Sequence, residues 1–313
     1  MSFSPDASVP AHRADWPPVK ILIVGGHGQL ATSLVTALSG DDVRALSHGE
    51  LDICDAGSVT GTIARIKPDV VINTAAMRRP DECESAPDRA FAVNALGARN
   101  VALACKAANC ALAHISTDYV FDDSKETPWM EDEIPNPPNV YGVTKLAGEH
   151  FVRQIVERFY IIRTSALFGG ATDISKGSNF VLMVLKRAAE GLDTNVVTDQ
   201  RMTPTYTPDL ARKISWLIRR EDYGVCHISN KGDCTWYEFA RAIFDKAGLT
   251  TGLIPITTDA LTVAARRLKY SVLGHGTLAR LGADDMPHWG IALDRYLKEL
   301  GRLRPAATHA SLE

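Results

Sequence analysis

The chain has 313 residues, of which 45% are hydrophobic and 23% are charged, and its formal net charge is -3. This composition is typical of a globular protein with one large domain or two smaller ones. The small net charge, with basic residues scattered along the chain, argues against a nucleic-acid-binding protein. No apolar run approaches the ~20 residues that span a bilayer, so we expect no membrane segment.

The cysteines indicate a reducing compartment. They stand at positions 54, 83, 105, 110, 226 and 234, without a C-x-x-C pair or the spacing of zinc ligands. Sparse cysteines in a chain of this length fit free thiols in the cytosol. The first 18 residues lack the apolar core of a signal peptide. We therefore predict a flexible tail over 1–18, a cytoplasmic location and no metal site.

Strand and helix patterns alternate from residue 19 to residue 165. Residues 20–24 form a short, continuous apolar run, which is typical of a strand buried on both faces of a parallel sheet. The next stretch has apolar residues at helical spacing and is closed by Gly40. The same patterns predict strands at 43–46, 69–73, 111–115 and 159–163, and helices at 58–66, 88–108 and 141–158. This alternation predicts an α/β fold, a Rossmann-type doubly wound parallel sheet with helices on both faces.

The alternation loosens after residue 165. Helices are expected at 180–189, 208–218 and 236–247, and residues 225–228 are predicted to return to the main sheet as a strand. The remainder would form a smaller cap over the strand ends. We therefore divide the chain into the tail, a cofactor-binding Rossmann domain (19–165) and a mainly substrate-binding C-terminal cap (166–313).

A glycine-rich loop joins the first strand to the first helix. Residues 25–31 read Gly-Gly-His-Gly-Gln-Leu-Ala, which fits G-x-x-G-x-x-A or G-x-G-x-x-A. Such glycines permit a tight turn and let the backbone approach a pyrophosphate at the helix N-terminus. The acidic residue expected at the end of the second strand is missing, since Leu46, Ser47 and His48 stand there, while Glu50 and Asp52 come later. The loop therefore predicts a dinucleotide site that permits NADPH and does not exclude NADH.

Polar residues at the end of the fourth strand and at the start of a helix form a candidate catalytic set. Ser116 and Thr117 end the strand, and Tyr141 and Lys145 lie one helical turn apart. A nearby ammonium lowers the pKa of a tyrosine, which can then exchange a proton with a carbonyl oxygen. Thr117 would align the same oxygen, and Ser116 is the adjacent alternative on the opposite side of the strand. The pattern predicts carbonyl–alcohol chemistry beside a nicotinamide.

These motifs together resemble those of extended short-chain dehydrogenases/reductases, and specifically of dTDP-4-dehydrorhamnose reductases. The resemblance extends from residue 20 to about residue 300. The segments that carry it are 25–30, 51–55, 68–73, 116–121 (Ser-Thr-Asp-Tyr-Val-Phe), 141–149 (Tyr-Gly-Val-Thr-Lys-Leu-Ala-Gly-Glu), 163–165 (Arg-Thr-Ser), 199–200 and 204–206.

The resemblance implies reduction of the C4 keto group of dTDP-4-dehydro-L-rhamnose to dTDP-L-rhamnose with NADPH or NADH, by an enzyme that is commonly a homodimer. It assigns Thr117, Tyr141 and Lys145 to catalysis, the last two also to cofactor binding. The other cofactor residues that it implies are Gly25, Gly28, Gln29, Leu30, Asp52, Ile53, Ala75 and Ala76. The substrate-side residues are Asp118, Tyr119, Asn179, Gln200 and Thr205.

Two positions depart from the reductase pattern. Ala166 stands where the family usually has an aromatic residue, often Trp. The segment Arg78-Arg79-Pro80 resembles instead the regulatory β subunit of methionine adenosyltransferase, an NADP-binding relative. The alternatives to a reductase of this sugar are therefore a nucleotide-binding regulatory subunit and another sugar-nucleotide reductase or epimerase. A dehydratase is disfavoured because Asp118-Tyr119 does not supply the acidic pair of that class.

Overall fold

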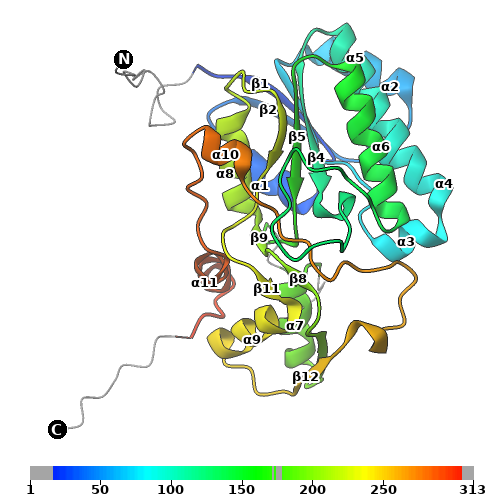
Figure 1. Cartoon of the computed structure of the whole chain (residues 1–313). Coiled ribbons are helices and arrows are strands. Elements are labelled where there is room, and N and C mark those ends of the chain that lie inside the picture. Colours follow the sequence, from blue (N-terminus) through cyan, green and yellow to red (C-terminus); the bar gives the residue numbers. More distant parts are fainter. Residues whose placement is uncertain (1–16, 171–172, 174–177, 305–313) are drawn as a thin grey trace, which may run out of the picture.

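The computed structural model describes residues 17–170, 173 and 178–304 (Figure 1). Most of the predicted tail, apart from residues 17 and 18, and the last nine residues of the predicted cap lie outside this part of the chain. No helix among the described residues is long and apolar enough to cross a membrane.

A six-stranded parallel sheet organises the fold, in the order β10-β5-β4-β3-β1-β2. Its strands are β1 (Lys20–Val24), β2 (Asp42–Leu46), β3 (Val70–Asn73), β4 (Ala111–Thr117), β5 (Phe159–Thr164) and β10 (Gly224–His227). The strand order reverses between β1 and β3, and ligands of open α/β sheets bind outside the carboxyl ends of the strands at such a point. The predicted fold class is confirmed, including the late strand that returns to the sheet.

Helices cover both faces of the sheet. One face packs on α1 (Gln29–Ala37) and α8 (Thr207–Leu217), whose buried leucines meet β1 and β3. The other packs on α2 (Ala56–Ile66), α5 (Ala98–Ala107) and α6 (Val140–Ile155). Both cores are almost wholly aliphatic, so the hydrophobic effect fixes the sheet between the two helical layers.

The lower part of the molecule in Figure 1 has its own aromatic core. The core lies among α7 (Phe180–Ala189), α9 (Trp236–Ala247) and α11 (Trp289–Glu299), and it includes Phe168, Tyr206, Phe239 and Tyr296. Three two-stranded sheets complete this part: β7 (Thr194–Val197) with β12 (Leu253–Ile256), β8 (Arg201–Met202) with β11 (Cys234–Thr235), and β6 (Leu167–Phe168) with β9 (Thr205–Tyr206). A short 3-10 turn, η5 (Thr258–Ala260), follows, whereas α10 (Gly276–Arg280) packs on β10 of the main sheet (Figure 1).

Two sequence predictions of helices are wrong in detail. The first helix ends at Ala37 rather than near Gly40. The predicted helix 88–108 is divided into α4 (Pro87–Ala90), a π-helical segment η2 (Phe91–Gly97) and α5, and it is preceded by α3 (Pro80–Ser85), which was not predicted. In η2 the buried Asn94 accepts a hydrogen bond from the Met77 N–H (2.8 Å) and donates one to its carbonyl (3.0 Å). Single-turn π segments of this kind are frequent at functional sites, and here the segment holds the loop that follows β3.

Helix α6 is fixed to the sheet by a buried ion pair. Arg163 on β5 donates to both carboxylate oxygens of Glu149 (3.0 and 2.7 Å), and Ser116 on β4 donates to one of them (2.5 Å). Both charged side chains are 2% exposed. At the other end of the helix, Gly142 packs so closely on the 3-10 turn η3 (Asp118–Val120) that a Cβ would overlap the Tyr119 carbonyl oxygen. The helix therefore has one defined position above β4 and β5.

Replacing Glu149 by alanine is expected to lower the free energy of unfolding by about 3–5 kcal/mol, because it leaves the Arg163 guanidinium buried and unpaired. Urea unfolding followed by circular dichroism measures the change. Glu82→Ala, which removes an exposed ion pair with Arg79 (2.7 Å), is the control and should cost less than about 1 kcal/mol. Equal losses in the two variants would contradict the role assigned to the buried pair.

Candidate active site

Two adjoining cavities lie along the carboxyl ends of the strands. The larger has a volume of about 690 Å³ and reaches from the glycine loop to β4, α6 and the start of α7. The smaller, of about 510 Å³, lies between the glycine loop and the segments 51–53 and 75–79. Both are lined by His27, Gly28, Thr74, Ala76 and Arg78. The pair has the place in the fold of a dinucleotide and substrate cleft.

Most of the predicted site residues lie in this cleft. Gly25, Asp52, Ile53 and Ala75 line the smaller cavity, Gln29 and Leu30 line the larger, and Gly28 and Ala76 line both. The larger cavity is also lined by Thr117, Asp118, Tyr119, Tyr141, Lys145 and Asn179.

Gln200 and Thr205 line neither cavity. The Gln200 amide donates to the Thr258 hydroxyl (3.0 Å), and Thr205 is fully buried in β9. Asn179 caps α7 by accepting from the Leu182 N–H (3.0 Å), and its amide donates to the Tyr296 hydroxyl (3.1 Å). Asn179 therefore shapes the wall of the cavity with both of its polar groups already bonded.

The glycine loop has the geometry of a phosphate-binding turn. Gly25 has a φ of +85°, and a Cβ there would lie 2.8 Å from the Ala75 nitrogen, so only glycine fits. The loop leads into α1, whose N-terminus at Gly28 has no side-chain cap. The buried Gln29 Nε2 and Thr164 Oγ1, both in residues that line the larger cavity, have no hydrogen-bond partner among the described residues. These unpaired polar groups fit a dinucleotide whose pyrophosphate rests on the helix N-terminus.

The end of β2 has an acidic residue nearby that lines neither cavity. Glu50, judged to come too late in the sequence, folds back so that its carboxylate accepts from the Ser47 N–H (2.8 Å) and hydroxyl (2.6 Å). These hydrogen bonds lower the pKa of Glu50. The smaller cavity itself is lined by both Asp52 and the cations Arg79 and Arg89. The cavity thus offers groups of either sign to an adenosine ribose, in agreement with a site for NADPH or NADH.

Thr117 and Tyr141 meet at the base of the larger cavity. The Thr117 hydroxyl donates to the Asp118 carboxylate (2.9 Å), and its interaction with the Tyr141 phenol acts to lower the pKa of Tyr141. Ser165 donates to the other carboxylate oxygen of Asp118 (2.8 Å). Burial raises the pKa of Asp118, and these hydrogen bonds oppose the increase. Thr117, rather than Ser116, is therefore the hydroxyl next to Tyr141.

The predicted effect of Lys145 on the pKa of Tyr141 is wrong for the protein by itself. Burial raises the pKa of Tyr141 well above its ordinary value, and Thr117 and Arg78 oppose the increase. The Lys145 ammonium donates instead to the Ile115 carbonyl (2.6 Å). Burial lowers the pKa of Lys145 to about 8, against the influence of Glu149. Tyr141 is thus held as a neutral phenol at pH 7, the form that donates a proton to a carbonyl oxygen.

The two departures from the reductase pattern both face the cleft. Ala166 lines the larger cavity with a φ of +44°, a conformation unusual for a non-glycine residue. Arg78 lines both cavities and has no hydrogen bond or ion pair within the described ranges, whereas Arg79 pairs with Glu82. The free guanidinium adds positive charge where a diphosphate would lie.

The sequence did not predict two further residues that line the larger cavity. Trp236 and Arg267 line the larger cavity from segments far along the chain. Arg267 forms an ion pair with Asp81 at the start of α3, and Asp81 also accepts from the Ala265 N–H (2.9 Å). This contact brings the segment 265–267 to the wall of the cavity, and no local sequence pattern predicts that position.

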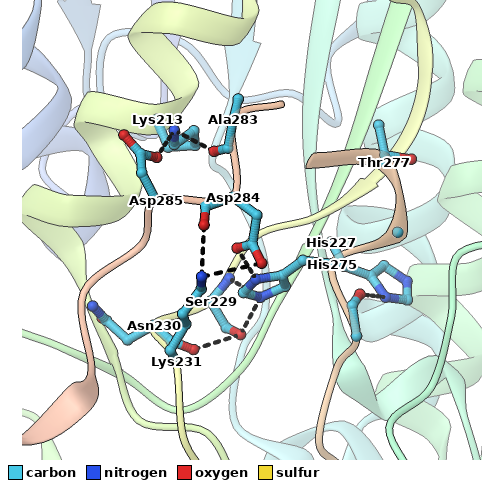
Figure 2. Close-up of polar contacts among 12 residues, drawn as sticks. Lys213, His227, Ser229, Asn230, Lys231, His275, Thr277, Ala283, Asp284 and Asp285 are labelled. Carbon is cyan, nitrogen blue, oxygen red and sulfur yellow. Dashed lines mark hydrogen bonds and ion pairs between the residues drawn. The ribbon is translucent and has the colours of Figure 1, made fainter. Parts of the chain in front are cut away.

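A second cluster has the connectivity of a hydrolase triad (Figure 2). The Ser229 hydroxyl lies 2.8 Å from His275 Nε2, and His275 Nδ1 lies 2.9 Å from the Asp284 carboxylate. However, Ser229 is fully buried, lies 3.1 Å from the Asn230 carbonyl to which it donates, and lines neither cavity described above. Lys231 also binds Asp284 (3.2 Å). The cluster therefore joins the segment after α10 to the end of β10 and has no access for a substrate.

No group of three or more His, Cys, Asp or Glu side chains within the described part of the chain is arranged to hold a metal ion.

Comparison with known proteins defines the family. Residues 19–302 match the family model described as the RmlD substrate binding domain. The chain belongs to this family. It is thus an extended short-chain dehydrogenase/reductase, as its motifs predicted.

Its relatives in the RmlD family match it over nearly their whole length. The spore coat polysaccharide biosynthesis protein SpsK of Bacillus subtilis is 38% identical, over 90% of this chain and 97% of that protein. A dTDP-4-dehydrorhamnose reductase of Streptomyces griseus is 37% identical, over 89% and 93%. The crystal structure of dTDP-4-dehydrorhamnose reductase from Bacillus anthracis in complex with NADP superposes with a TM-score of 0.87 at 36% identity, over 90% of this chain and all of that one.

Ser229→Ala is expected to lower the free energy of unfolding by about 1 kcal/mol, the net contribution of a buried hydrogen bond. Thermal and urea unfolding measure this loss. Because Ser229 lies outside the cleft, the variant should bind NADPH as tightly as the wild type. An esterase activity of the wild type that disappears in Ser229→Ala would show instead that the triad is catalytic.

Proposed function

We propose that this protein reduces the C4 keto group of a nucleotide-linked 4-dehydro-6-deoxy sugar with NADPH or NADH, and that its substrate is dTDP-4-dehydro-L-rhamnose, giving dTDP-L-rhamnose. The observation that carries the proposal is the convergence of Thr117, Tyr141 and Lys145 in one cavity beside the glycine loop. The name of the Streptomyces griseus relative and the NADP complex of the Bacillus anthracis structure support the substrate and the cofactor.

Different residues of the chain bind different parts of the cofactor and the substrate along the cleft. Gly25, Gly28 and the N-terminus of α1 hold the pyrophosphate, and Asp52 and Ile53 contact the adenine side. We propose that residues 19–165 supply these contacts and that 166–313 mainly bind the nucleotide sugar. Asp118 and Tyr119, with Asn179, lie on the substrate side of the larger cavity. Gln200 and Thr205 remain substrate-side residues by resemblance alone.

Tyr141 donates the proton in the proposed reaction. The bound NADPH or NADH supplies a hydride, which reduces the keto carbon. Thr117 and Tyr141 bind the keto oxygen, and the neutral Tyr141 phenol gives its proton to that oxygen, so that a carbonyl and a hydride become an alcohol. Lys145, one turn along α6, lines the same cavity and supplies positive charge there while the phenolate regains its proton.

We propose a homodimer in the cytoplasm that does not bind nucleic acid. Leu96 and Leu103 are 51% and 41% exposed on the consecutive helical segments η2 and α5, and Val143 is 39% exposed on the neighbouring α6. Apolar side chains on two adjacent helices suit pairing with the same surface of a second copy.

The six free cysteines and the need for NADPH support the cytoplasmic location. The net charge of -3 supports the proposal that the protein does not bind nucleic acid.

Tyr141→Phe tests the proposed chemistry. With NADPH and dTDP-4-dehydro-L-rhamnose, the wild type should consume NADPH, measured as loss of absorbance at the nicotinamide band, and the variant should lose about 10²- to 10⁴-fold in kcat. NADPH should still bind, as measured by calorimetry, because the variant keeps the aromatic ring and the other cofactor residues and loses only the phenol hydroxyl. Full activity of the variant would disprove the role of the phenol.

No turnover by the wild type, together with tight NADPH binding, would favour the regulatory alternative. The free Arg78 and the small Ala166 are the features that favour it. Turnover of a different nucleotide-linked keto sugar would keep the reductase and change only its substrate.

Leu103→Glu tests the proposed dimer. A buried glutamate at the centre of an apolar helical interface should convert the dimer to a monomer, which sedimentation velocity detects. Ile134→Glu, at an exposed residue away from these helices, is the matched control and should remain dimeric. A wild-type monomer, or a Leu103→Glu dimer, would rule this interface out.

A further inference from the structure

Arg78 lies where the two cavities of the cleft meet. It lines both of them, as do His27 and Gly28 of the glycine loop and Thr74 and Ala76 of the loop after β3. From this point the smaller cavity continues toward the segment after β2, and the larger one continues toward β4 and α6. A dinucleotide that occupies both cavities therefore has its diphosphate beside Arg78.

The backbone on both sides of Arg78 is held in place. The Asn94 amide of η2 bonds to the N–H (2.8 Å) and to the carbonyl (3.0 Å) of the preceding Met77. On the other side, Arg79 is the N-cap residue of α3, and Pro80 begins that helix, where the fixed φ of proline suits the first turn. The side chain of Arg78 therefore extends from a defined point on the cavity wall.

The carboxylates that line the two cavities are engaged with other groups. Glu82 pairs with Arg79 (2.7 Å). Asp118 accepts hydrogen bonds from two hydroxyl groups (2.9 and 2.8 Å), and Asp52 accepts one from a backbone N–H (2.9 Å). Arg78 itself has no hydrogen bond or ion pair in the part of the chain that the structure describes. Its guanidinium is thus available to an anionic ligand in the middle of the cleft.

The glycine loop next to Arg78 also offers unpaired donors to an anion. The N-terminus of α1 at Gly28 has no side-chain cap, and the buried Gln29 Nε2 has no hydrogen-bond partner among the residues described. This loop and the loop that carries Arg78 are in contact, since a Cβ on Gly25 would lie 2.8 Å from the Ala75 nitrogen. The free guanidinium and the uncapped helix N-terminus, which both favour a negatively charged ligand, thus belong to neighbouring loops.

We propose that Arg78 binds the diphosphate of NADPH or NADH and holds it against the N-terminus of α1. A guanidinium forms two parallel N–H···O bonds with a phosphate, and such charge-assisted bonds are stronger than those between neutral groups. A nucleotide sugar also carries a diphosphate, but Arg78 lines the smaller cavity as well as the larger one, which Arg267 does not. The inference rests on the proposed function only for the identity of the cofactor, and it applies equally to a reductase and to a regulatory subunit.

Arg78→Met tests the assignment, because methionine keeps much of the length of the side chain and removes its charge. In calorimetric titrations, the Kd values for NADPH and for NADH should both rise by about 10- to 100-fold, as expected for the loss of a hydrogen-bonded charge. Arg89→Met is the matched control, since Arg89 lines the smaller cavity and not the larger one. This variant should bind NADH, which has no 2′-phosphate, within about twofold of the wild type.

Arg78→Met should unfold at the same urea concentration as the wild type, because the guanidinium has no partner to lose in the free protein. A clear loss of stability would contradict the free guanidinium on which the inference depends. The variant saturated with NADPH should also bind dTDP as tightly as the wild type does.

Other results would overturn the assignment. A loss of affinity confined to NADPH would place Arg78 at the 2′-phosphate, and unchanged affinity for both cofactors would leave the diphosphate to the glycine loop alone. A loss confined to dTDP would assign Arg78 to the nucleotide sugar. Failure of the reductase assay, together with Arg78-dependent binding of both cofactors, would count against the proposed function and leave this assignment intact.

Discussion

The buried contact of Glu149 with Arg163 and Ser116 is the constraint on which the site depends. It fixes α6 to β4 and β5 at the same time, so the first turns of α6 lie above the carboxyl ends of the strands. Tyr141 and Lys145 are one turn apart on that helix, and Thr117 ends β4. The relative positions of the three side chains thus follow from one buried ion pair and one close helix contact at Gly142. A surface pair would be too weak to define them.

The electrostatics of the cleft favour a neutral acid beside an anionic ligand. Burial keeps the Tyr141 phenol and its proton together, and it raises the pKa of the neighbouring Asp118. Arg78 adds positive charge to the same cavity, whereas the charge of Arg267 is paired with Asp81. Diphosphates are attracted to such a positive charge, whereas the reacting carbonyl would meet the hydroxyl groups of Thr117 and Tyr141. The arrangement suits reduction of a neutral keto group carried on a charged nucleotide.

Much of the fold was predictable because each buried strand and each long amphipathic helix leaves a periodic pattern. The six strands of the sheet, the glycine loop and the pair Tyr141–Lys145 all belong to this class. The two-residue strands were not predicted, since elements so short have no pattern distinct from a loop. The helix α11 was overlooked although its buried residues Ala292, Leu293, Tyr296 and Leu297 have helical spacing. The π-helical turn at Asn94 has the composition of an α-helix, and only its contact with Met77 reveals it.

The errors at the site have a common cause, which is that the decisive partners are distant in sequence or belong to the backbone. Lys145 was expected to act on Tyr141, yet the Ile115 carbonyl and His114 hold its amine. Arg267 reaches the cavity through Asp81, 186 positions away in the sequence. Sequence spacing can predict which residues lie at one edge of a sheet, but the hydrogen-bond partners of these residues are known only from the packed structure.

Transfer of deuterium tests the central claim most directly. The protein would be incubated with dTDP-4-dehydro-L-rhamnose and NADPH deuterated at the reactive face of the nicotinamide C4, and the product would be examined by NMR. A cleft that performs the proposed reduction must deliver the deuterium to the sugar C4, with the hydroxyl proton coming from solvent through Tyr141. Tight binding of the cofactor with no deuterium at the sugar C4 would contradict the account.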